Sequence, residues 1–128
     1  SYYEDVTATV SPDFTMAPEE GIEAPASIDV TFNQDVDPTS VVIKVTGADG
    51  AEVAGKVEQS TTDPKMFSFK PDAALKAGDY TLSVSGAKGV AAGNVMTEMS
   101  QTFKVKEAAK AAKIKVKEAA KAAKKGKK

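Results

Sequence analysis

Apolar and polar residues alternate along most of the first 105 positions of this 128-residue chain, in short runs separated by turn-forming residues. A period of two is typical of strands that bury one face. Ile28, Val30 and Phe32, for example, fall on one face of their run. The expected strands span residues 5–10, 27–32, 41–46, 52–60, 66–70, 79–85 and 98–105. Seven short strands in about 100 residues predict an all-β fold, a seven-stranded immunoglobulin-like β-sandwich.

Three aromatic residues are expected to have structural roles. Tyr80 ends the segment LKAGDY and begins an alternating run, the position at which a sandwich carries a tyrosine corner. In that motif the ring packs inward and the hydroxyl bonds to the backbone a few residues upstream. Phe32 and Phe103 lie on the inward faces of their runs. After the third run, Asp49-Gly50 favours a tight hairpin turn.

Several short motifs occur in the order found in bacterial Ig-like domains of S-layer and other surface proteins. They are PEEG at 18–21, SIDVTF at 27–32, DVDPTS at 35–40, FKP at 69–71, LKAGDY at 75–80, AGN at 92–94 and TF at 102–103. The chain resembles this family over about residues 6–105. The resemblance implies a surface-exposed β-sandwich that serves as a spacer, lattice unit or adhesive element. The long C-terminal tail departs from that pattern.

The same order of Pro-x-x-Gly, strand, Leu-x-x-Gly-x-Tyr and Phe-x-Val also resembles periplasmic copper carriers of the copper-resistance type. Copper sites in that family rest on His and Met. This chain has no His, so its only soft donors are four methionines, at positions 16, 66, 96 and 99. Met96 and Met99 are three positions apart and could hold Cu(I), although methionines are more often packing residues.

Composition excludes several classes of function. The chain has no Cys, His or Trp, which removes cysteine nucleophiles, the commonest general base and the usual zinc sites. We therefore expect no enzymatic activity and no catalytic residue. All seventeen basic residues are Lys, and without Arg sequence-specific DNA recognition is not expected. The apolar runs are too short for a membrane span.

Charge divides the chain into two parts. Residues 1–103 carry sixteen Asp and Glu against six Lys, a net charge of −10. Residues 104–128 carry eleven Lys against two Glu, a net charge of +9. The predicted organisation is an acidic sandwich over residues 1–105 and a basic tail over residues 106–128. Such a tail requires an anionic partner, which could be another copy's acidic body or a foreign polyanion.

The tail repeats the sequence KVKEAAKAAK at 104–113 and 115–124, with a period of eleven residues. That period places like positions on one face of a helix, but the helix would be marginal because lysines repel at this spacing. The tail is therefore expected to be helical or disordered. Its repeat could equally be a duplicated linker or an added segment, and residues 114–117 could also add as a strand to an exposed sheet edge. The candidate binding residues are Lys106, Lys110, Lys113, Lys117, Lys121 and Lys124.

Acidic residues near the turns offer one further candidate site. Asp35 and Asp37 precede Pro38 and could contribute oxygen ligands to Ca²⁺, although no EF-hand spacing is present. Solvated turn residues are the simpler interpretation, and no cofactor is otherwise expected.

These observations favour an extracellular or cell-surface structural or adhesive module whose signal peptide has been removed. In this hypothesis the basic tail binds neighbouring acidic bodies and gives a homo-oligomer, or binds other protein modules. The alternatives are binding of a polyanion such as nucleic acid, teichoic acid or lipopolysaccharide through the tail, and a metal-carrying sandwich.

Overall fold

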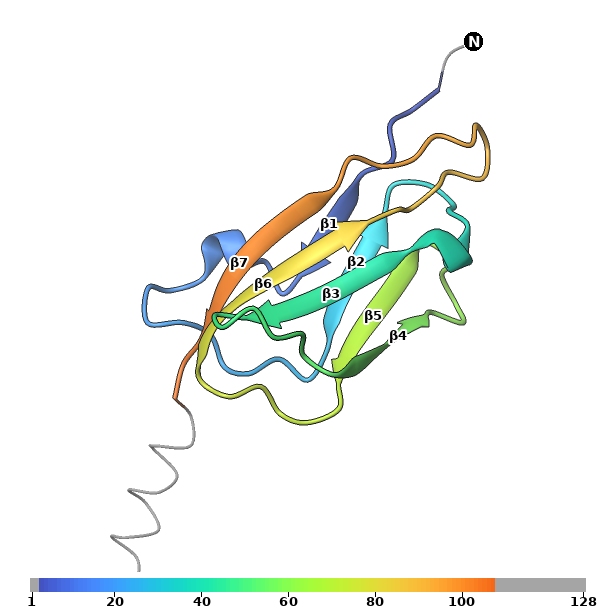
Figure 1. The fold of residues 1–128 in the computed structure, drawn as a ribbon. Helices are drawn as coiled ribbons and strands as arrows, with labels where there is room; N and C mark the ends of the chain where they lie inside the picture. Colours follow the sequence, from blue (N-terminus) through green and yellow to red (C-terminus); the bar gives the residue numbers. More distant parts are fainter. Residues whose placement is uncertain (1–2, 108–128) are drawn as a thin grey trace, which may run out of the picture.

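The computed structural model describes residues 3–107, which form seven strands in two antiparallel sheets (Figure 1). The larger sheet has the order β1-β2-β5-β4 and the smaller one the order β3-β6-β7. The strands are β1 (Ala8–Ser11), β2 (Ile28–Phe32), β3 (Val42–Gly47), β4 (Gly55–Gln59), β5 (Met66–Pro71), β6 (Gly78–Ser85) and β7 (Met99–Val105). Two short 3-10 helices, η1 (Phe14–Met16) and η2 (Pro38–Ser40), lie in the connections. The predicted all-β sandwich is confirmed for this part of the chain.

The strand order is that of a constant-type immunoglobulin domain, in which strands A, B, E and D face strands C, F and G. Each inner face carries the alternating apolar residues that the sequence pattern predicts. Ile28, Val30 and Phe32 of β2 are buried, as are Leu82 and Val84 of β6. The core therefore lies between the two sheets, and burial of these side chains stabilises the sandwich by removing apolar surface from water.

The connection from β3 to β4 differs from a simple hairpin. The expected tight turn is present: Gly50 has a φ of 84° and its N–H donates to the Gly47 carbonyl at 2.9 Å. Beyond it, however, only Glu52 forms a bridge, with Thr46 of β3. The chain then crosses to the other sheet, where β4 pairs with β5. The local conformation of the turn determines where the chain reverses direction. The packing of two sheets around one core determines that β4 pairs with β5.

The first strand starts later than the pattern predicts. A strand is expected from residue 5, but the ladder with β2 begins at Ala8, which is paired with Phe32. Residues 4–7 precede β1 without forming part of a strand. We call residues 4–7 the N-terminal strap. This segment is held by hydrogen bonds from side-chain amides and not by the backbone ladder of a neighbouring strand.

At the opposite end of the sandwich, the chain leaves the fold after β7. Ile22 forms a parallel bridge with Val105, and the Lys106 N–H donates to the Ile22 carbonyl at 2.9 Å. Within residues 3–107, no helix is long and apolar enough to cross a membrane. The expected helical or disordered tail beyond Glu107 lies outside the described residues.

Candidate methionine site

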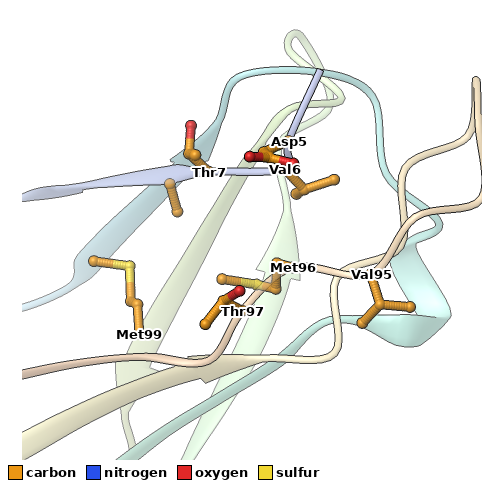
Figure 2. A pocket seen from close by; sticks show the side chains of 8 residues that line it. Asp5, Val6, Thr7, Val95, Met96, Thr97 and Met99 are labelled. Atoms are coloured by element: carbon orange, nitrogen blue, oxygen red, sulfur yellow. The ribbon is translucent and has the colours of Figure 1, made fainter. Parts of the chain in front are cut away.

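A cavity of about 330 Å³ lies between the N-terminal strap and the segment that leads into β7 (Figure 2). One wall comes from the strap and the first residue of β1. The other wall comes from residues 95–99. The lining residues are Asp5, Val6, Thr7, Ala8, Val95, Met96, Thr97 and Met99. We call this cavity the methionine pocket.

Met96 and Met99 reach the pocket for different local reasons. The Met96 N–H donates to the Ala87 carbonyl at 2.9 Å, which ties this residue to the connection between β6 and β7. Its side chain is only 8% exposed. Met99 is the first residue of β7 and pairs with Val84 of β6, so its position is fixed by the sheet. The spacing of three therefore spans a change from loop to strand.

The donor atoms of the pocket can be compared with what copper ions prefer. Cu(II) favours nitrogen and oxygen ligands in tetragonal arrangements, whereas thioethers favour Cu(I). The chain contains no imidazole or thiol, so an imidazole- or thiolate-based site cannot be built from its side chains. The pocket supplies two thioethers together with the Asp5 carboxylate and two threonine hydroxyls. This donor set fits a soft monovalent ion better than Cu(II).

The other two methionines lie elsewhere in the described structure. Met16 belongs to η1 and is 80% exposed. Met66 begins β5, where it pairs with Thr31 of β2. Neither lines the methionine pocket. The structure therefore divides the four methionines of the sequence into one pair that shares a cavity and two isolated residues.

Two of the three predicted structural aromatics, Tyr80 and Phe103, belong to a stack at the opposite end of the sandwich. The Tyr80 hydroxyl donates to the Lys76 carbonyl at 2.6 Å, the geometry of a tyrosine corner. The Tyr80 ring stacks on Phe103 at a centroid distance of 5.3 Å, and Phe14 stacks on Phe103 at 4.3 Å. Phe32 packs edge-on against Phe67 in the core. Phe14 was missed from the sequence, because it lies in a single turn of 3-10 helix rather than in an alternating run.

The two calcium candidates do not share a site with other carboxylates. Asp37 caps η2: its Oδ1 accepts from the Thr39 N–H at 2.9 Å and from the Thr39 hydroxyl at 2.8 Å. These hydrogen bonds lower the pKa of Asp37 below its usual value of 3.8. Asp35 is exposed, and its carbonyl accepts from the Val90 N–H at 3.0 Å. Among residues 3–107 no group of three or more acidic, His or Cys side chains could hold a metal. Calcium binding at Asp35 and Asp37 stays a prediction.

Of the six candidate lysines, the structure describes only Lys106. Its side chain is exposed beside the end of β7. Lys110, Lys113, Lys117, Lys121 and Lys124 lie outside the described residues.

Sequence reasoning named Met96 and Met99 but missed the groups that form and hold the opposite wall. Asn33 and Gln34 follow β2, and Asn94 lies between β6 and β7. Their side chains bond the N-terminal strap. A cluster of amide residues just after a strand was the available signal, but nothing in the pattern indicated which segment these amides would contact.

The comparisons with known proteins agree with the copper-carrier resemblance. The family model described as the CopC domain matches residues 14–106. Among solved structures, the chain is similar to PcoC from Escherichia coli, described as a methionine-rich copper resistance protein. The TM-score is 0.56 and the identity 27%, over 66% of this chain and 85% of that one. CopC from Methylosinus trichosporium OB3b shares the fold, with a TM-score of 0.65 and 17% identity over 83% of this chain and 96% of that one. A comparison with curated proteins finds no match.

The S-layer resemblance proves secondary. Domains 1–6 of the surface layer protein SbsC match with a TM-score of 0.50 and 22% identity, over 66% of this chain and 12% of that one, which shows a shared fold alone. The family match corrects our expectation of an S-layer-like, self-assembling or adhesive protein, which is wrong. Alternating strands, turn motifs and the tyrosine corner are common to both kinds of sandwich, so the residues that define the fold could not separate them. With most of its length matched by the family model, the chain belongs to the CopC domain family.

Proposed function

We propose that this protein is a non-enzymatic carrier of copper that holds Cu(I) through the thioethers of Met96 and Met99. The single observation that carries the proposal is that these two soft donors line one cavity, whereas Met16 and Met66 do not. Membership of the CopC domain family supports copper as the cargo, as does the likeness to a methionine-rich copper resistance protein. The same relationship supports a location outside the cytoplasm.

The expected oxidation state of the bound copper follows from the thioether ligands. Thioether sulfur is soft and polarisable and binds Cu(I) in preference to Cu(II). Val6 and Ala8 contribute apolar surface to the opposite wall, which limits the access of water to a bound ion. We therefore expect the protein to bind Cu(I) and Ag(I) and to bind Cu(II) weakly.

The proposal is tested by anaerobic competition for Cu(I) against the chromogenic chelator bicinchoninate. The key variant is Met96→Leu combined with Met99→Leu, because exchange of Met for Leu keeps the volume and costs less than about 1.5 kcal/mol. We expect this variant to lose Cu(I) binding. The matched control is Met16→Leu combined with Met66→Leu, which removes the same number of thioethers outside the pocket and should bind Cu(I) as the natural chain does.

Two results would count against this function. A natural chain that takes no Cu(I) from the chelator would exclude a carrier. Equal loss of binding in both double variants would show that the pocket has no special role.

A second proposed activity rests on the charge of residues 104–128, which is +9. We propose that this segment binds a polyanion through counterion release, without preference for sequence. Retention of the full chain on heparin resin is the test. A chain ending at Glu107 should pass through at low salt, because the remaining body is acidic. Equal retention of both chains would exclude the tail as the binding segment.

A further inference from the structure

The wall of the methionine pocket formed by the N-terminal strap is attached differently from the rest of the sandwich. Strand ladders bind neighbouring segments by repeated backbone hydrogen bonds, but the ladder between β1 and β2 begins only at Ala8. Before it, the Asn33 N–H donates to the Thr7 carbonyl at 3.0 Å. Beyond that contact, side-chain amides make the bonds to the strap.

Three side-chain amides hold the strap, and we call Asn33, Gln34 and Asn94 the amide clamp. Gln34 Nε2 and Asn94 Nδ2 both donate to the Glu4 carbonyl, at 2.9 and 3.0 Å. Asn33 Nδ2 donates to the Asp5 carbonyl at 2.8 Å and to the Glu4 carboxylate at 2.6 Å. Asn33 Oδ1 accepts from the Thr7 N–H at 2.9 Å. The clamp thus joins the strap to the two loops at this end of the sandwich.

Gly89 shows how closely the clamp and the strap are packed. A Cβ at this position would lie 2.5 Å from Gln34 Oε1, 2.9 Å from Asn94 Oδ1 and 3.3 Å from Val6 Cγ2. A side chain there would force the Gln34 and Asn94 side chains to shift, so the clamp, the strap and the connection between β6 and β7 meet at one point. The closed arrangement is therefore specific rather than a loose contact.

The closed arrangement is also inexpensive to open. Of residues 4–7, only Val6 is buried, so little apolar surface holds the strap. The clamp bonds are exposed to solvent, where water can replace them. Asn94 Oδ1 is buried and, within the described structure, has no hydrogen-bond partner. Opening would hydrate this oxygen and recover the free energy lost by burying it. Segments with these features open locally without global unfolding.

We propose that the N-terminal strap is a gate for the methionine pocket, held shut by the amide clamp, and that its opening controls how fast a soft metal ion enters and leaves. The inference rests on the proposed function for its cargo. Met96 is almost fully buried and the strap forms the facing wall of its pocket, so lifting of the strap widens the route by which an ion reaches its sulfur. Reclosure over the bound ion then slows release. A gate of this kind changes rates in both directions and leaves the affinity nearly unchanged.

The test uses the full chain with Gln34→Ala combined with Asn94→Ala. Neither residue lines the pocket, so the donor set remains intact. Cu(I) uptake from its acetonitrile complex and Cu(I) release to excess bicinchoninate are measured by stopped flow. We expect both rates to rise roughly tenfold, because each amide bond contributes a few-fold to the closed population. The dissociation constant should change less than about twofold, since both rates rise together.

A metal-free measurement accompanies the kinetics. Hydrogen exchange of the Thr7 N–H reports strap opening directly, because Asn33 Oδ1 accepts this hydrogen in the closed arrangement. Exchange should accelerate in the double variant. The matched control is Gln59→Ala, which removes a side-chain amide bond of the same type, to the Pro64 carbonyl at 3.0 Å, on β4 at the far edge of the sheet. It should alter neither Thr7 exchange nor Cu(I) rates.

The possible results distinguish failure of the gate proposal from failure of the carrier proposal. Cu(I) binding with unchanged rates in the double variant would overturn the gate and leave the carrier standing. A large fall in affinity would also overturn the gate, because it would mean that the clamp shapes the binding site itself. Absence of Cu(I) binding by the natural chain would overturn the carrier, and the gate with it.

Discussion

At the residue scale, the hydroxyl of Tyr80 illustrates how one polar atom fixes a connection. It donates to the Lys76 carbonyl across the turn that leads into β6, while the ring packs on Phe103. The two contacts have different physical origins: the first satisfies a backbone acceptor, and the second buries apolar area. A substitution can remove one and leave the other.

Tyr80→Phe should lower the free energy of unfolding by about 0.5–1.5 kcal/mol, because it deletes the hydrogen bond and keeps the ring. Chemical denaturation of the variant and the natural chain measures the difference. Tyr3→Phe is the matched control, since Tyr3 is 55% exposed and no hydrogen bond to its hydroxyl is seen in the described structure. If Tyr80→Phe and the natural chain are equally stable, the hydrogen bond of the tyrosine corner does not contribute to stability.

Asp37 links stability to pH. Its pKa is lowered because Thr39 donates two hydrogen bonds to the carboxylate, so the folded state favours the charged form. The stabilisation is therefore present above pH 3.8 and is lost as the pH falls through the lower pKa of the folded state. Asp37→Asn should melt at a lower temperature than the natural chain at pH 7, and the two melting temperatures should converge as the pH falls through the lowered pKa of Asp37. A constant difference across this range would contradict the assignment.

At the element scale, the strands differ in how many neighbours protect them. β2, β5 and β6 have partners on both sides, whereas β4 pairs only with β5 and all five of its residues are exposed. Such an edge strand leaves alternate N–H groups open to water. In this strand order β4 is an edge strand that contributes little to the core.

Hydrogen exchange should rank the strands accordingly. We expect the N–H groups of β4 that face away from β5 to exchange at nearly unprotected rates, and those of β2 and β6 to exchange only through global unfolding. Amide exchange followed by two-dimensional NMR gives both values in one experiment. Strong protection along the outer side of β4 would show that another segment covers this edge.

At the scale of the whole molecule, the core ends before the basic repeat does. Within residues 3–107, all buried core residues lie between Val6 and Val105. A chain ending at Glu107 should therefore keep the midpoint of thermal unfolding within about 2 °C, because the deletion removes none of these core residues and should change stability by no more than a surface substitution does. A drop of 10 °C would show that residues beyond 107 pack on the body. Calorimetry of both chains at one salt concentration decides between these results.

Much of the architecture could be predicted from the local pattern of apolar, polar and turn-forming residues. Alternation placed all seven strands, because a residue buried on one face must recur at every second position in a strand. The Asp49-Gly50 turn was readable because a positive φ suits glycine. Charge counts showed the contrast between the body and the last 25 residues, since they need no coordinates. These features depend on neighbours in the chain.

The remaining features depend on residues that are distant in the chain. Whether β4 pairs with β3 or β5 was decided by the packing of two sheets around one core. Met96 and Met99 were candidates from their spacing, but only the fold brought the N-terminal strap across from them and separated them from Met16 and Met66. The amide clamp joins residues 26 to 90 positions apart, and no local pattern encodes such a contact. The sequence by itself determined the strands and the available donors, because these follow from periodicity and composition. The tertiary structure alone decided which donors share a cavity and what closes it, because these follow from long-range packing.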